Sequence, residues 1–219
     1  MTVSLISVNL PDFGIPKEQP TINAEIYKER LIKFKNDLKN HEMQSAVIYA
    51  DREHFANMHY LTGFDPRFEE ALLIINVSDD ISYLITGPEN QGYSNISEIN
   101  LTKKNFPTFG LLGQDRKKSS SLDNILLECN LKDKKNCGVV GWKYFTSDEF
   151  EKPEEKFDIP NYILNSIEKV TGNISYLKNI TSWFMHPTTG YRSKNEIDEI
   201  AFFEFSSCHT SESLKNVLK

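Results

Sequence analysis

Apolar and polar positions follow two different periods along the chain, and this predicts that strands and helices alternate. Short β-branched apolar runs are typical of strands buried on both faces, whereas longer segments repeat apolar residues every three to four positions, as amphipathic helices do. The pattern predicts strands at residues 46–50, 71–76, 81–86, 106–112 and 138–142, and a last strand or extended segment at 174–177.

The first predicted helix begins at Asn23, a suitable N-cap, and continues to about His41 with Tyr27, Leu31, Phe34 and Leu38 on one face. Further helices are predicted at residues 52–60, 89–100, 122–129 with a cap at 119–121, and 159–170 with a stop at 172. The short turn 78–80 joins two strands, which implies an antiparallel hairpin. Together these elements predict an α/β domain with a mixed parallel and antiparallel sheet flanked by helices.

Two segments flank this domain. Residues 1–20 contain three prolines and predict an extended leader. Near the other end, Ser193 and Glu196 have capping-box spacing, and the helix they predict meets no glycine or proline after Ile197. We therefore expect a leader at 1–20, an α/β domain at 21–190 and, at 191–219, the start of a linker helix toward a further domain.

Composition narrows the class of protein. The 219 residues are 39% hydrophobic and carry a formal net charge of -6, with a pI near 5.5. An acidic chain without a long basic run argues against nucleic acid or an anionic membrane as the partner. The first ten residues lack the basic region of a signal peptide, and three cysteines without metal spacing suit reduced thiols. We expect a soluble cytoplasmic protein.

The turn between the strands at 46–50 and 71–76 carries the most unusual side chains. Gly63 stands between aromatic residues, where a positive φ is expected, and Asp65 and Arg67 flank a proline in a turn beside Phe64 and Phe68. One interpretation is that this loop presents an aromatic ring and a cation to a ligand or partner. The alternative is that the aromatic residues pack in the core and Arg67 is a solvated turn residue.

No catalytic motif accompanies this turn. The glycines at 138–141 lack the GxGxxG pattern of a nucleotide loop, and no serine lies in a Gly-x-Ser-x-Gly elbow. The five histidines also lack metal-ligand spacing. We assign no catalytic residue and no metal ligand to this chain.

Two patches carry a family resemblance. Residues 57–64, ending in Tyr-Leu-Thr-Gly-Phe before the strand at 71–75, form the first; Arg192-Ser193-Lys194-Asn195-Glu196-Ile197 forms the second. The chain resembles the N-terminal, non-catalytic domain of the creatinase/prolidase/aminopeptidase P group, the Xaa-Pro metallopeptidases. The second patch departs from the family's Arg-x-x-Lys-x-x-Glu-Ile pattern, either by one residue fewer before the lysine or by a shifted register. The resemblance implies a creatinase-type, ribonuclease H-like α/β fold.

The resemblance also implies partners for this domain. In that family a catalytic domain of pita-bread fold follows, and two aspartates, one histidine and two glutamates there hold two divalent metals, Mn, Co or Zn. We therefore expect no cofactor in this chain itself, a C-terminal catalytic domain as its natural partner, and a peptide as substrate of the parent enzyme. The N-terminal domain would assist formation of a homodimer and close the partner subunit's substrate pocket, with Phe64, Asp65, Arg67 and Phe68 at the pocket edge.

Two other functions remain open at this stage. The chain would be a stand-alone protein-binding module if it were a pseudo-enzyme of the same family. A small Rossmann-like enzyme is disfavoured because the phosphate-binding loop is missing. An exposed apolar face on the last helix would also favour self-association.

Overall fold

The structure, a computed structural model, describes residues 3–4, 6–117 and 119–218. The chain divides into two compact units. Residues 24–194 form an α/β unit, and residues 1–23 form a second unit with residues 195–219. Each unit is described here by itself.

A six-stranded mixed sheet forms the centre of the α/β unit, in the order β4-β3-β2-β1-β5-β6. Antiparallel pairs join β1 to β2 and β2 to β3, whereas β3–β4, β1–β5 and β5–β6 are parallel. This confirms the predicted mixed sheet and the hairpin. The strands are β1 (Ser45–Ala50), β2 (Ala71–Asn76), β3 (Ser82–Thr86), β4 (Leu101–Asn105), β5 (Cys137–Val140) and β6 (Leu177–Asn179).

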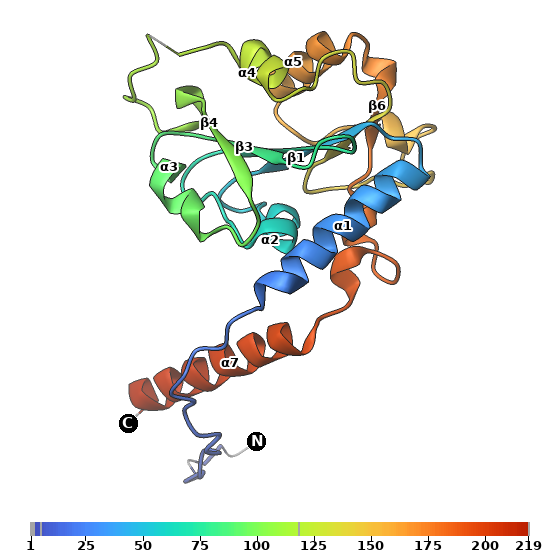
Figure 1. Cartoon of the computed structure of the whole chain (residues 1–219). Helices are drawn as coiled ribbons and strands as arrows, with labels where there is room; N and C mark the ends of the chain where they lie inside the picture. Colours follow the sequence, from blue (N-terminus) through green and yellow to red (C-terminus); the bar gives the residue numbers. More distant parts are fainter. Residues whose placement is uncertain (1–2, 5, 118, 219) are drawn as a thin grey trace. The chain divides into compact units, whose positions relative to one another are not determined.

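Helices cover both faces of the sheet, so its central strands are buried throughout. Successive side chains of a strand point to opposite faces. In β1, Val47 and Tyr49 belong to one core cluster, and Ala46 and Ile48 belong to the other. Helices α4 (Leu122–Glu128) and α5 (Asn161–Thr171) pack on the first face, and α1 (Ala24–Asn40), α2 (Ala56–Thr62) and α6 (Ser182–Met185) pack on the second (Figure 1).

Several predicted helix ends are confirmed. The hydroxyl of Ser121 accepts a hydrogen bond from the Asn124 N–H at 3.3 Å and so caps α4. Helix α5 ends at Gly172, whose φ of 102° lies in the left-handed region where glycine is favoured. Local chemistry is sufficient to fix these ends.

The strand predicted at 106–112 is wrong. The edge strand is β4, whose Thr-Lys-Lys-Asn sequence is half-buried and lacks an apolar period. Lysines on an edge strand discourage pairing with another chain. Because lysines replace apolar residues there, the hydrophobic pattern did not predict this strand. Phe106 instead precedes a 3-10 turn and Phe109 ends it, and their rings pack edge to face with centroids 4.9 Å apart.

Two predicted helices have different bounds in the structure. The segment 89–100 holds only α3 (Asn90–Tyr93) and a 3-10 turn at Ser94–Ile96. Helix α2 begins four residues later than predicted, because the Asp51 carboxylate accepts the N–H groups of Glu53 and His54, both at 2.8 Å, and forms a turn there. The segment 174–177 is a 3-10 turn followed by β6.

The second unit contains the leader and α7 (Ile197–Leu218). Ser193 does not cap this helix as predicted, since its hydroxyl donates to the Gly190 carbonyl at 2.7 Å within a 3-10 turn. The Glu199 carboxylate instead accepts the Glu196 N–H at 3.2 Å, which satisfies a donor at the helix start. Among the described residues, no helix combines the length and apolar character needed to cross a membrane.

Candidate functional site

The loop from Gly63 to Glu70 joins α2 to β2, next to the carboxyl end of β1. Gly63 has a φ of 70°, which confirms the predicted positive φ, and its N–H donates to the His59 carbonyl at 2.8 Å. A Cβ at this position would lie 3.3 Å from the Tyr27 ring. Glycine therefore permits both the left-handed turn and the close approach of α1.

Buried polar groups fix the inner side of this loop. Phe64 is fully buried, and its N–H donates to the Thr62 hydroxyl at 3.0 Å. The side-chain amide of Asn90 donates to the Pro66 carbonyl. Glu69 is 2% exposed, and its carboxylate accepts the N–H groups of Glu89 and Asn90 at 2.9 and 3.0 Å. These contacts tie the loop to the first turn of α3.

The outer side of the loop exposes a cation and an aromatic ring. Arg67 adopts a φ of 53°, and its backbone N–H donates to the Asp65 carboxylate at 3.2 Å. Its Nε donates to the Tyr93 hydroxyl at 2.9 Å, and the guanidinium carbon lies 4.9 Å from the Tyr93 ring centroid. The hydrogen bond to Tyr93 and the charge of Asp65 raise the pKa of Arg67. Phe68 is 61% exposed.

The structure therefore separates the four residues singled out in the sequence. Asp65 and Arg67 lie together at the surface, Phe68 projects beside them, and Phe64 belongs to the core. Arg67 is held in a defined position although its side chain is exposed, because Asp65 and Tyr93 contact the same guanidinium. Such a group can pair with a carboxylate from outside the domain.

A cavity of about 280 Å³ adjoins this loop at the carboxyl end of β1. Its lining residues come from the segment after β1, from the loop and from the 3-10 turn near β4. They are Asp51, Arg52, Glu53, His54, Phe68, Glu69, Glu70 and Phe109. The cavity thus has an acidic wall and an aromatic rim.

Hydroxyl groups behind this wall are bonded to its carboxylates. Tyr49 lies 3.1 Å from the Asp51 carboxylate and 3.0 Å from that of Glu70, and the Tyr162 hydroxyl donates to the other Glu70 oxygen. Burial and the charges of Glu70 and Asp51 raise the pKa of Tyr49 well above its ordinary value, and burial with the Glu70 contact does the same for Tyr162. Both tyrosine hydroxyls therefore act as hydrogen-bond donors to these carboxylates.

His54 forms the remaining side of the cavity. Its Nδ1 lies 3.0 Å from both Asp51 carboxylate oxygens, and its ring stacks on Trp142 with centroids 4.4 Å apart. Burial raises the pKa of Asp51, but hydrogen bonds from His54 and from two backbone N–H groups outweigh it and lower that pKa overall. The pair is held as a structural contact between the ends of β1 and β5.

Asn57 and Arg192, to which the sequence alone assigned no contact, connect distant segments. The Arg192 guanidinium donates to the Asn57 side-chain oxygen at 2.9 Å, and the Asn57 amide donates to the Gly141 carbonyl at 2.8 Å. Asn57 is 4% exposed. This chain of contacts ties the start of α2 to the end of β5 and to the segment after α6. Both residues stand in the patches that carry the family resemblance, but no local pattern reveals that they meet.

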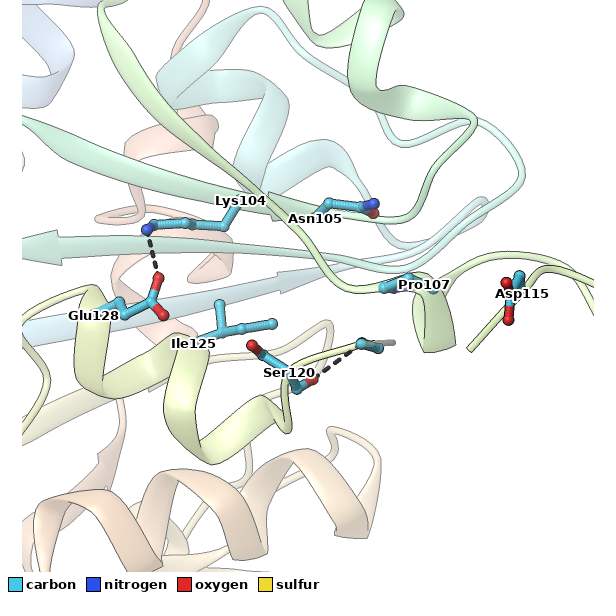
Figure 2. A pocket seen from close by; sticks show the side chains of 8 residues that line it. Lys104, Asn105, Pro107, Asp115, Ser120, Ile125 and Glu128 are labelled. Carbon is cyan, nitrogen blue, oxygen red and sulfur yellow. Dashed lines mark hydrogen bonds and ion pairs between the residues drawn. The ribbon is translucent and has the colours of Figure 1, made fainter. Parts of the chain in front are cut away.

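A second cavity, of about 330 Å³, lies between β4 and α4 (Figure 2). Figure 2 shows Lys104 directed toward Glu128, and their charged atoms are 2.6 Å apart. The cation is thus neutralised by its neighbour. The lining residues are Lys104, Asn105, Pro107, Asp115, Ser119, Ser120, Ile125 and Glu128.

A third cavity, of about 390 Å³, lies between α1 and α6 and is lined by His41, Trp183, His186 and four neighbours. The Nδ1 of His186 accepts the N–H groups of Thr188 and Thr189, so this histidine caps its own loop. Within residues 3–4, 6–117 and 119–218, no group of three or more His, Cys, Asp or Glu side chains could hold a metal ion.

Comparisons with protein families and with curated proteins find no match. Solved structures do match. A prolidase from Pyrococcus horikoshii is 14% identical with a TM-score of 0.44, over 69% of this chain and 32% of that one. The creatinase/prolidase N-terminal domain of an X-Pro dipeptidase from Streptococcus pyogenes is 12% identical with a TM-score of 0.48, over 71% of this chain and 95% of that one. A proline dipeptidase from Streptococcus pneumoniae is 16% identical with a TM-score of 0.45, over 69% and 91%.

The chain thus spans about a third of the Pyrococcus prolidase and most of the two streptococcal chains. At identities and scores this low, the likeness by itself establishes no function.

Proposed function

We propose that this chain is the non-catalytic N-terminal domain of a Xaa-Pro metallopeptidase of the creatinase/prolidase/aminopeptidase P group. The observation that carries the proposal is the contact between Arg192 and Asn57, which are 135 positions apart. One residue stands in each of the two patches that resemble the family. Two chance matches have no reason to meet in space, whereas two features of one domain do.

The proposed role of the domain is to assist dimerisation and to close the substrate pocket of a partner subunit. The loop supports this role because it exposes Arg67 and Phe68 on a backbone that Glu69 and Asn90 hold in place. The Arg67 Nε faces Tyr93, and a guanidinium has four further N–H donors, enough for a bidentate contact with a peptide carboxylate. The two metals and the catalytic residues would belong to the following domain.

The first test is the source gene beyond codon 219. The proposal expects the reading frame to continue and to encode two aspartates, one histidine and two glutamates in a second domain. The 219-residue chain alone should then show no turnover of X-Pro peptides with added Mn, Co or Zn. A stop codon after Lys219, or turnover by the pure chain, would contradict the proposal. A stop codon would favour the protein-binding module.

The second test addresses Arg67 in the full-length protein. A charged hydrogen bond to the substrate would be lost, so Arg67→Ala should lower kcat/KM for a dipeptide by roughly an order of magnitude. The control is Lys132→Ala, which removes an exposed cation between α4 and β5, near the opposite ends of the strands. An unchanged kcat/KM in Arg67→Ala would exclude this residue from the substrate pocket. It would not contradict the assignment of the domain, which the gene sequence beyond codon 219 tests separately.

A further inference from the structure

A loop between the edge of the sheet and α4 carries three consecutive serines directly after basic residues. It runs from Gly110, which follows the 3-10 turn at Pro107–Phe109, to Ser121, the N-cap of α4. Its described residues form no helix or strand, and Leu112 is 92% exposed. Loops that protrude in this way from a packed domain are where modifying enzymes reach a chain most easily.

The charge pattern of this loop is that of a substrate for a protein kinase that prefers basic sequences. Arg116 and Lys117 stand three and two positions before Ser119. Such kinases bind an arginine three positions before the acceptor with carboxylates of their own, in a charge-assisted forked contact. Arg116 is the only arginine of the sequence that precedes a serine or threonine by three positions. The pattern is therefore confined to one place in an acidic chain.

The structure leaves this segment accessible. Arg116 and Lys117 are exposed, and Ser119 is partly exposed. The Arg116 guanidinium donates to the Gly110 carbonyl at a long 3.4 Å. The backbone contacts are local, since the Ser119 N–H donates to the Arg116 carbonyl at 3.3 Å and the Lys117 N–H to the Asp115 carboxylate at 3.0 Å. A kinase can therefore extend the segment while the sheet stays intact.

Of the three serines, Ser119 is the best acceptor. Its hydroxyl donates to the carbonyl of the next residue at 3.0 Å, a contact that costs little to break. The hydroxyl of Ser121 caps α4, so modifying it would remove a helix cap. Ser120 has a lysine three positions before it, and an ammonium group cannot make the forked contact of a guanidinium.

A cation lies in the cavity that Ser119 lines. This is the cavity of about 330 Å³ between β4 and α4 (Figure 2). The Lys104 amine donates to the Glu128 carboxylate at 2.6 Å, and this hydrogen bond raises the pKa of Lys104, so the amine is charged. The side chain of Glu128 is 53% exposed and that of Lys104 is 28% exposed. Glu128 can therefore turn into water and leave Lys104 to another anion.

A phosphate on Ser119 would be such an anion. The charged side chains that line the cavity are Lys104, Asp115 and Glu128, one cation and two carboxylates. Phosphoserine carries a charge of about -1.5 to -2 at pH 7 and three acceptor oxygens. It therefore repels both carboxylates and attracts Lys104 more strongly than Glu128 does. Because Lys104 belongs to β4, the new contact would tie the loop to the edge strand.

We infer that Ser119 is the acceptor for a protein kinase that recognises Arg116, and that its phosphate binds Lys104 in place of Glu128. In the transfer, the Ser119 oxygen forms a bond to the γ-phosphorus of ATP, the bond from that phosphorus to ADP breaks, and the hydroxyl proton passes to a base of the kinase. The inference uses residues of the loop, β4 and α4, so it does not depend on the proposed function.

The first half is tested by incubating the folded chain with Mg-ATP and the catalytic subunit of cAMP-dependent protein kinase, which prefers basic residues before its acceptor. Mass spectrometry should find a single phosphate, on Ser119, and none in Ser119→Ala. Arg116→Ala should lower kcat/KM for phosphorylation about tenfold or more. The control is Lys132→Ala, which removes an exposed cation that precedes no serine by three positions and should leave the rate unchanged. No incorporation, a phosphate placed elsewhere, or an equal rate in Arg116→Ala would overturn the inference.

The second half is tested on the phosphorylated chain by phosphorus NMR, which follows the second ionisation of the phosphate. Pairing with Lys104 should lower that pKa by about 0.5 unit from its ordinary value of about 6, and Lys104→Ala should restore it. Lys103→Ala is the matched control, because successive side chains of β4 point to opposite faces of the sheet. It should leave the pKa of the phosphate lowered. A pKa that is the same with and without the Lys104 amine would show that the phosphate does not bind there.

Discussion

Replacing Glu69 by alanine should destabilise the α/β unit more than replacing any exposed carboxylate. Glu69 lies in a slot between two glycines: a Cβ added to Gly87 would collide with its carboxylate, and one added to Gly110 would be 2.9 Å from its Oε1. Its two oxygens accept the N–H groups of Glu89 and Asn90, which open the first turn of α3. The carboxylate is therefore the acceptor for one buried and one partly buried backbone donor.

The expected decrease in the free energy of unfolding follows from these two hydrogen bonds. A hydrogen bond to a charged group contributes about 1.5 to 3 kcal/mol, and two bonds that share one carboxylate are not additive, so Glu69→Ala should lower the free energy of unfolding by about 3 kcal/mol. Glu69→Gln keeps one acceptor oxygen but turns an NH₂ group toward a backbone N–H, so about 2 kcal/mol is expected. Gly87→Ala should also destabilise, because its Cβ collides with the same carboxylate.

Urea unfolding followed by tryptophan fluorescence measures these changes, since Trp142 and Trp183 both lie in the α/β unit. The control is Glu154→Ala, which removes the same charge from an exposed 3-10 turn and should change stability by less than about 0.5 kcal/mol. If Glu69→Ala costs less than about 1 kcal/mol at an unchanged m-value, the carboxylate does not hold the loop as described.

Two further predictions concern titration and reactivity. Burial and nearby carboxylates, those of Glu70 and Asp37, raise the pKa values of Tyr49, Tyr162 and Tyr191. In the unfolded chain these tyrosines lose their protons near the ordinary pKa of 10, so the free energy of unfolding should fall as the pH rises past 10. Ultraviolet absorbance of tyrosinate checks this, and nine tyrosines that titrate together near pH 10 would refute it. Burial raises the pKa values of the Cys129 and Cys137 thiols to about 12, so a thiol reagent near neutral pH should label only Cys208 in the folded chain. Labelling that persists in Cys208→Ser without denaturant would contradict that expectation.

The strands that the sequence predicted best are those whose signal is local. Strand β2 has the predicted bounds because its apolar run is continuous and a short turn joins it to β3. Strand β4 was missed because an edge strand is half-solvated, and its lysines follow from that position in the sheet. The whole fold determines which strand lies at the edge of a sheet, so no short window of sequence predicts that position.

The same distinction separates the parts of the candidate site. The positive φ of Gly63 could be predicted, since a glycine between aromatic residues at a helix end has a local explanation. The roles of Glu69 and Asn57 could not be predicted, because their partners lie 20 to 135 positions away in the sequence. Before the fold is known, a buried carboxylate and a solvated one look alike in a sequence.

These long-range contacts decide how a functional test of the loop should be interpreted. Glu69, Asn90 and Asn57 hold backbone segments together, whereas Arg67 and Phe68 project from a backbone that is already fixed. Substituting an outward side chain should therefore leave stability nearly unchanged, and substituting a buried anchor should not. A loss of activity in Arg67→Ala with an unchanged unfolding midpoint would then report a lost contact with substrate. The same loss in Glu69→Ala would report only that the loop had moved.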